Sequence, residues 1–196
     1  MSEKKGSLSA LVFLVVLTSL CTVFLSFTNT MYQGVKAGRQ RELRMKIWED
    51  FDNDIDLTAF DREFSEAVSV KENGKNIYYM YAPRHLAALH MIGPGLWGDI
   101  ELLMLIDYEN KMINKLYVLS QIETPGLGAR ISEQPFLDQF SNLDYSKTVR
   151  IEKERSGKPG EVDAISGATK TSKSLEAIIN AGLKTFASFG GKEAKP

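Results

Sequence analysis

Four residues near the end of the chain, Ser166-Gly167-Ala168-Thr169, place two hydroxyl groups just before an amphipathic segment. Apolar residues follow at spacings of three to four, at Leu175, Ile178, Ile179, Leu183 and Phe186. This spacing predicts a helix that begins near Thr169. Hydroxyl groups at a helix start cap free backbone N–H groups. The same N–H groups and the helix dipole can instead hold a phosphate. These residues alone leave both interpretations open.

Two further segments, at residues 93–98 and 123–128, are rich in glycine and proline. They read Gly93-Pro94-Gly95-Leu96-Trp97-Gly98 and Glu123-Thr124-Pro125-Gly126-Leu127-Gly128. Glycine lets the backbone approach a flat ligand, proline stiffens the loop, and leucine or tryptophan offers apolar surface to a ring system. A tight turn with one core anchor has the same composition. Neither segment is a phosphate loop of the nucleotide-hydrolase type, because no Gly-Lys-Ser/Thr follows.

Residues 163–169 have the form D-x-x-S-G-A-T. This motif resembles the attachment motif of the FMN-binding domain found in the G subunit of Rnf electron-transport complexes and in the C subunit of sodium-translocating NADH:quinone reductases. The two glycine-rich segments resemble the remaining hallmarks of that family in the same order, G-x-G-L-W and E-T-P-G-L-G, with a predicted hairpin between them. The resemblance covers about Gly93 to Phe186. Members often have a histidine shortly before E-T-P-G-L-G, where this chain has Gln121.

The resemblance implies a covalent cofactor. The hydroxyl of Thr169 would carry FMN through a phosphoester, installed by a separate flavin transferase that uses FAD. Ser166, Gly167 and Ala168 would shape the loop and offer N–H groups to the phosphate, and Asp163 would orient the loop or be recognised by the transferase. The remaining cofactor-binding residues would form the wall of the flavin ring site: Glu123, Thr124, Pro125, Gly126, Leu127, Gly128, Gly95, Leu96 and Trp97. A single cysteine and no Cys/His cluster leave redox chemistry to such a cofactor, and we expect no metal site.

A run without any charge, from Leu8 to Thr28, predicts a transmembrane helix. At about 1.5 Å per residue it spans ~31 Å, close to the hydrocarbon thickness of a bilayer. It is longer than the apolar region of a cleaved signal peptide, and no A-x-A-like site follows it. The predicted organisation is a short tail (1–7), the transmembrane helix (8–28), a partly helical connector (29–60), one FMN-binding domain (61–190) and a C-terminal tail (191–196).

The sequence gives conflicting signals about the side of the membrane on which the following domain lies. Two lysines precede the apolar run, and five basic residues follow it, namely Lys36, Arg39, Arg41, Arg44 and Lys46. A count of these charges places the following domain inside, although long domains translocate largely regardless of charge. The family resemblance implies the opposite side. We therefore expect a single-pass protein of the cytoplasmic (inner) membrane with its flavin domain on the outer, periplasmic side.

The sequence predicts an α+β domain with a largely antiparallel sheet and flanking helices. The expected elements are strands at 77–81, 101–106, 115–120 and 148–153, a turn at 107–111, a short helix at 135–140 and a turn at 156–160. The acidic run from Glu49 to Asp56 lacks the sixth-position glycine and terminal glutamate of an EF-hand. It is therefore expected to be a solvated connector.

Together these features imply an electron-carrying redox subunit without a catalytic site of its own. Its partners would be the other membrane and redox subunits of an Rnf-type complex, in which electrons pass between ferredoxin and NAD⁺ with ion movement. The short chain resembles that subunit more than the longer quinone-reductase subunit, which stays an alternative. Another is a membrane-anchored, extracytoplasmic ligand-binding module without covalent flavin.

A hydrolase is disfavoured, because His85 and His90 accompany no serine or cysteine nucleophile motif. A net charge of −1 gives no reason to expect nucleic acid.

Overall fold

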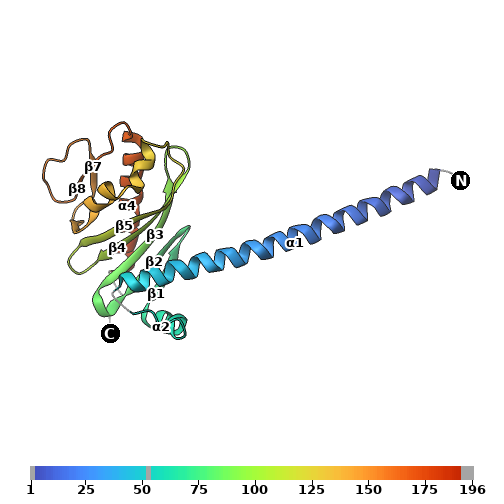
Figure 1. The fold of residues 1–196 in the computed structure, drawn as a ribbon, viewed down its shortest axis with the longest axis horizontal. Helices are drawn as coiled ribbons and strands as arrows, with labels where there is room; N and C mark the ends of the chain where they lie inside the picture. Colours follow the sequence, from blue (N-terminus) through green and yellow to red (C-terminus); the bar gives the residue numbers. More distant parts are fainter. Residues whose placement is uncertain (1–2, 52–53, 191–196) are drawn as a thin grey trace. The chain divides into compact units, whose positions relative to one another are not determined.

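The structure is a computed structural model that describes residues 3–51 and 54–190. The chain forms two units, Met1–Ile47 and Trp48–Pro196. The first consists of the helix α1 (Glu3–Asp50), whose last three residues belong to the second unit (Figure 1). Among the described residues, α1 is the one helix long and apolar enough to cross a membrane, by length and composition. The predicted apolar span at 8–28 lies inside it.

The helix α1 is longer than the sequence analysis expected. Its 48 residues extend over ~72 Å at about 1.5 Å each, against a hydrocarbon core of about 30 Å. Within the predicted connector (29–60), the helix continues from residue 29 to Asp50, and residues 54–59 are not helical. The predicted C-terminal tail at 191–196 lies outside the described residues, as do the first two residues of the predicted N-terminal tail.

The second unit is built on a six-stranded sheet in which neighbours in the sheet are also neighbours in sequence and every pair is antiparallel. Its strands are β1 (Ser69–Asn73), β2 (Asn76–Tyr81), β3 (Leu86–Pro94), β4 (Asp99–Asp107), β5 (Met112–Ser120) and β6 (Leu143–Asp144). The α+β class with a largely antiparallel sheet is thereby confirmed. Three of the predicted strands lie within β2, β4 and β5, and the predicted turn at 107–111 connects the last two.

The strand β3 was not predicted. Its residues 87–91 are all buried, so both of its faces are covered and the apolar side chains do not alternate with polar ones. A continuous apolar run of this length is ambiguous between a strand and a helix. The result is that the predicted loop at 93–98 begins inside a strand, because β3 continues through Gly93 and Pro94.

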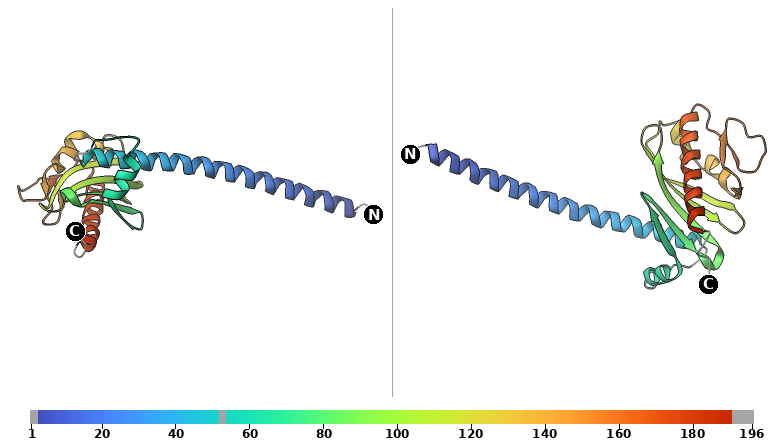
Figure 2. Two further views of the ribbon diagram at one scale, coloured as in Figure 1. Left: turned by 90° about the horizontal axis from the view of Figure 1, so that it is seen from below. Right: turned by 180° about the vertical axis from the view of Figure 1, so that it is seen from behind.

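One face of the sheet is covered by the helix α4 (Thr169–Gly190), which lies against β3 (Figure 1; Figure 2, right). The predicted helix after Thr169 is confirmed, and its apolar stripe makes the core. The buried side chains on this face include Leu89, Met91, Leu102, Met104, Ile106, Leu175, Ile178 and Ile179. Burying a side chain of this size contributes roughly 1.5–3 kcal/mol relative to leaving it exposed, so this stripe fixes α4 on the sheet.

Aromatic side chains occupy the opposite face. Phe51 stacks on Tyr81 at 5.4 Å between ring centroids, and Phe64, from helix α2 (Phe60–Ala67), meets Tyr79 edge to face at 6.0 Å. The acidic run at 49–56 is not solvated throughout, because Tyr117 donates a hydrogen bond of 3.0 Å to the Asp50 carboxylate. Asp50 therefore contributes to the anchoring of this segment on the sheet.

The remaining elements connect the sheet to α4. The predicted helix at 135–140 is two short pieces, α3 (Gln134–Leu137) and a 3₁₀ turn (Asp138–Phe140), preceded by another 3₁₀ turn (Gly128–Ser132). A third 3₁₀ turn (Ala82–Arg84) joins β2 to β3. The predicted strand at 148–153 is the shorter β7 (Arg150–Glu152), which pairs in parallel with β8 (Glu161–Asp163) as a separate two-stranded sheet. This pair is the exception to the antiparallel pattern.

The contact between α4 and β3 gives a stability prediction. A methyl group at Gly182 would overlap the sulfur of Met91. We expect Gly182→Ala to destabilise the domain by about 1–3 kcal/mol, because overpacking outweighs the gain in helix propensity. Urea unfolding of the full-length protein in detergent measures the change. In a double-mutant cycle, Met91→Ala combined with Gly182→Ala should cost less than the sum of the two single changes; simple additivity would contradict the contact.

Candidate functional site

The three motifs singled out from the sequence meet at one cavity of about 260 Å³. It lies at the N-terminal end of α4, the upper end in Figure 2 (right). Residues from all three motifs line it, together with two further residues of α4: Leu96; Glu123, Thr124, Leu127 and Gly128; Gly167, Ala168 and Thr169; Lys170 and Thr171. The sheet brings the first two motifs together, because they begin where β3 and β5 end.

The buried carboxylate of Glu123 joins the first two motifs to the first turn of α4. Its Oε1 accepts hydrogen bonds from the backbone N–H of Leu96 at 2.8 Å and of Trp97 at 3.1 Å. Its Oε2 accepts a hydrogen bond of 2.6 Å from the hydroxyl of Thr171 on α4. Only 4% of Glu123 is exposed, so these donors replace the water that an exposed carboxylate would bind. One side chain thus fixes two loops and a helix relative to one another.

The segment around Glu123 needs glycine for close approach. A Cβ at Gly128 would lie 2.6 Å from the Thr171 hydroxyl oxygen and 2.9 Å from Glu123 Oε2. Any larger residue would therefore displace the Thr171 hydroxyl or the Glu123 side chain. Gln121 supports the same turn, because its side-chain oxygen accepts a hydrogen bond of 2.6 Å from the N–H of Glu123.

The first turn of α4 presents unpaired backbone donors. Ala168 N–H bonds to Ile165 and Ser172 N–H bonds to Ala168. Across the part of the chain that the structure describes, the N–H groups of Thr169, Lys170 and Thr171 have no hydrogen-bond partner. Gly167 has φ +79°, the left-handed region where other residues are strained, and it turns the chain into the helix beside Leu127. The loop therefore leaves the helix start open to an anion.

Four hydroxyl groups lie at this helix start, and they differ in access. Thr171 is buried and donates to Glu123, whereas Ser172 is buried and accepts a hydrogen bond of 3.3 Å from Ile165 N–H. Ser166 and Thr169 are exposed, and among the described residues neither hydroxyl has a partner. The capping interpretation of these two hydroxyls is therefore wrong. Of the two, Thr169 lines the cavity.

Not every predicted site residue lies at the cavity. Asp163 accepts a hydrogen bond of 3.0 Å from Arg155 N–H, so it holds the loop before the motif. Pro125 and Gly126 form the exposed tip of their turn, and Trp97 is 66% exposed. Gly95 lines an adjoining groove of about 680 Å³, which shares Leu96 and Lys170 with the cavity and runs between α4 and the end of β3. The cavity and the adjoining groove are together called the recess.

The segment from Gly93 to Gly98 has the spacing G-x-G-x-x-G, which in dinucleotide-binding proteins leads from a strand into a helix. Here it joins two antiparallel strands, β3 and β4, so it is no dinucleotide loop.

The two histidines are structural. His90 Nε2 lies 2.7 Å from Glu101, and the exposed His85 lies 3.1 Å from Glu109.

Thr171 was not among the residues predicted for the site. Thr171 precedes Leu175 by four residues, so it lies on the same face of α4, one turn nearer the N-terminus of the helix. A hydroxyl on the buried face of a helix requires a partner, because an unpaired buried polar group is costly. That signal identifies Thr171 as a buried donor, although it does not identify Glu123 as the acceptor.

Comparison with known proteins agrees with this geometry. Residues 95–184, which include all three motifs from Gly95 onward, match the FMN-binding domain family. This part of the chain is therefore similar to an FMN-binding domain. It is similar to the G subunit of the ion-translocating oxidoreductase complex of Methanosarcina acetivorans, with 29% identity over 192 residues that cover 92% of this chain and 93% of the relative.

A second relative is the G subunit of the proton-translocating ferredoxin:NAD(+) oxidoreductase complex of Clostridium ljungdahlii. It is 30% identical over 126 residues, which cover 62% of this chain and 66% of the relative. Among solved structures, the C subunit of the Na(+)-translocating NADH-quinone reductase of Parabacteroides distasonis has a TM-score of 0.54 at 19% identity. That match covers 78% of this chain and 92% of the other. The chain therefore shares its fold with that C subunit.

The role of Glu123 as the common acceptor can be tested by stability. We expect Glu123→Ala to lower the free energy of unfolding by about 1–3 kcal/mol, because the buried Thr171 hydroxyl loses its acceptor. Glu123→Gln should cost less, since its amide can both accept from Leu96 and donate to Thr171. Denaturant unfolding in detergent provides the measurement, with the exposed Glu154→Ala as a control that stays within about 0.5 kcal/mol of the parent. Equal stability of Glu123→Ala and Glu154→Ala would contradict this role.

Proposed function

We propose that this protein is a membrane-anchored electron-transfer subunit that carries FMN in a phosphoester to Thr169. The observation that carries the proposal is the position of this hydroxyl. Thr169 is exposed, lines the cavity and begins α4, where three backbone N–H groups are unpaired among the described residues. A phosphodiester retains one negative charge, and the start of a helix stabilises such a charge.

The residues present fit FMN. Lys170 adds a positive charge beside the unpaired N–H groups. Leu96 and Leu127 offer apolar surface, with 46% and 44% of each residue exposed. The recess of cavity and groove has space for a ring system beyond the phosphate. When bound, FMN supplies the redox chemistry, and the protein supplies position and electrostatics. Thr169 is the anchor in this proposal, and Glu123 positions the loops around it.

The relatives support a proposal for the complex to which this subunit belongs. Two of them are G subunits of ion-translocating complexes, and the similarity to one extends over nearly the whole of both chains. We therefore assign this chain to an Rnf-type ferredoxin:NAD⁺ oxidoreductase, with the other membrane and redox subunits as partners and a flavin transferase for maturation. The helix α1 is the anchor in the cytoplasmic membrane. The flavin domain is assigned to the outer, periplasmic side.

Intact mass tests the covalent link. The protein coexpressed with an active flavin transferase should gain the mass of one FMN less one water, mapped to Thr169. Thr169→Val should lose the adduct, because the acceptor oxygen is gone. Ser166→Ala is the matched control: it removes the other exposed hydroxyl at this helix start, which does not line the cavity, so it should keep the adduct. An unmodified parent protein, with the transferase active on another substrate, would refute the proposal, and an adduct on Ser166 would refute the assignment to Thr169.

The assignment of Leu127 to the ring wall predicts a change in redox potential. Leu127→Ala should shift the midpoint potential of the covalent flavin while the mass adduct is retained. A tenfold change in the relative affinity for oxidised and reduced forms moves a two-electron potential by about 30 mV. Leu119→Ala, at a partly exposed leucine outside the recess, is the control and should leave the potential unchanged. If redox titration gives the same midpoint for all three proteins, Leu127 is not part of the wall.

A further inference from the structure

One face of α4 forms a wall of the groove that adjoins the cavity. The residues of this face recur at spacings of three and four, at Lys170, Ser174, Ala177 and Ala181. Lys170 is the first of them and follows Thr169 directly. It also lines the cavity, as Leu96 does from the loop between β3 and β4. Lys170 therefore borders both spaces, one residue from the proposed attachment point.

The ammonium group of Lys170 is unpaired within residues 3–51 and 54–190. The residue is exposed, and its side chain makes neither an ion pair nor a hydrogen bond in that part of the chain. The other lysine of the groove differs, because Lys173 Nζ lies 2.9 Å from Glu176 and 3.6 Å from Glu152. Of the two ammonium groups, that of Lys170 is the one whose charge is open to a ligand.

The charges that line the recess are few. Among the described residues they belong to Lys170, Lys173 and Glu123. The Glu123 carboxylate already accepts from two backbone N–H groups and from the Thr171 hydroxyl. The unpaired N–H groups in the first turn of α4 add the positive end of the helix dipole. The negative charge of the recess is thus held by its own donors, whereas the positive groups remain open.

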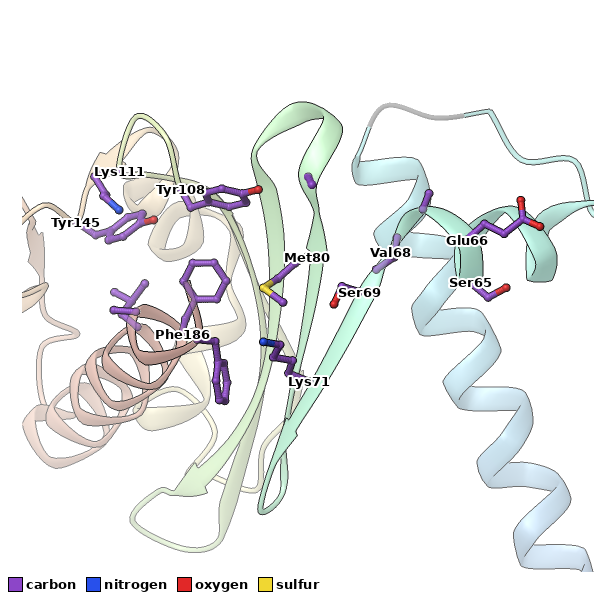
Figure 3. A pocket seen from close by; sticks show the side chains of 15 residues that line it. Ser65, Glu66, Val68, Ser69, Lys71, Met80, Tyr108, Lys111, Tyr145 and Phe186 are labelled. Atoms are coloured by element: carbon purple, nitrogen blue, oxygen red, sulfur yellow. The ribbon is translucent and has the colours of Figure 1, made fainter. Parts of the chain in front are cut away.

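The opposite end of α4 has a different character. A second cavity, of about 510 Å³, lies there, and its aromatic wall consists of Tyr108, Tyr145, Phe186 and Phe189. Figure 3 shows Lys71 and Lys111 on opposite sides of Phe186, and Glu66 also lines the space. The C-terminal end of a helix carries the negative end of its dipole. The end of α4 that can stabilise added negative charge is therefore the one at the recess.

Reduction of a flavin adds such a charge. Uptake of two electrons and one proton leaves the ring of FMN with one negative charge, and uptake of a second proton neutralises it. In the proposed complex, the partner redox subunits supply and remove the electrons. A positive group near the ring nitrogens is one means by which a protein sets these equilibria. It favours the charged reduced form over the neutral oxidised form and over the doubly protonated form.

We propose that the Lys170 ammonium group stabilises the negative charge that reduced FMN carries on its ring. This inference rests on the proposed function, because it requires the flavin at Thr169. Lys170 lies on the groove face of α4, where space for a ring system adjoins the attachment point. Its charge raises the midpoint potential. A contact with the phosphodiester alone would not, because the charge of that group is the same in both redox states.

Redox titration as a function of pH tests this role. The full-length protein is coexpressed with an active flavin transferase and purified in detergent, and intact mass verifies the adduct on each variant. At high pH, Lys170→Gln should lower the midpoint potential by about 30 mV, which corresponds to a tenfold destabilisation of the anionic reduced form. The same tenfold change should raise the pH of the second proton uptake by about one unit. Below the pH at which the parent takes up this proton, the two curves should coincide.

Two control variants separate the charge of Lys170 from other effects. Lys170→Arg keeps the charge and should retain the pH dependence of the parent. Lys184→Gln removes an exposed lysine of α4 that lines neither the cavity nor the groove, so it should leave the curve unchanged. Coincident curves for the parent and Lys170→Gln, each with its adduct, would overturn this inference and leave the proposed function intact. A parent without an adduct would overturn both.

A measurement on the parent alone applies if the transferase does not load Lys170→Gln. The reduced flavin of the parent should take up its second proton at a lower pH than free FMN in the same buffer, because the ammonium group favours the anion. The absorption spectrum of the reduced flavin, recorded against pH, provides the readout. Proton uptake at the same pH as free FMN, or at a higher one, would contradict the role of Lys170.

Discussion

The carboxylate of Glu123 is the interaction on which the site depends. Its two oxygens accept two backbone N–H groups of one loop and the hydroxyl of a helix, at distances of 2.6–3.1 Å. A buried charge is tolerated only when it is fully hydrogen-bonded, because desolvation is otherwise too costly. The segments at 95–98, 123–128 and 167–171 therefore share one requirement. Each must bring its donor or its glycine close to the same side chain.

The helix α4 connects this site to the core of the domain. Its apolar stripe is buried against the sheet, so its position is set by core packing rather than by the loops. Its first turn leaves N–H groups open at one end, and its last turns form the aromatic wall at the other. Because one rigid element carries both ends, the recess and the second cavity are each built from the same core contacts. The sheet provides the complementary half of both.

Sequence reasoning found the elements with strong periodic or turn signals. Two elements were predicted and are present in the structure: the helix whose apolar stripe begins at Leu175, and the hairpin around residues 107–111. It missed β3, because residues buried on both faces do not alternate. It also missed the bond between Thr171 and Glu123, which joins residues 48 positions apart. Local patterns identify a buried donor, whereas only the tertiary fold identifies its acceptor.

The different burial of the hydroxyls at the start of α4 has a consequence for maturation. In an unfolded chain, Ser166, Thr169, Thr171 and Ser172 are equally accessible and chemically alike. Folding withdraws Thr171 and Ser172 and leaves Thr169 at the cavity. If the proposed attachment is correct, its regioselectivity is a property of the folded substrate as well as of the enzyme. Cofactor loading would then act as quality control, since a misfolded chain would not present the correct acceptor.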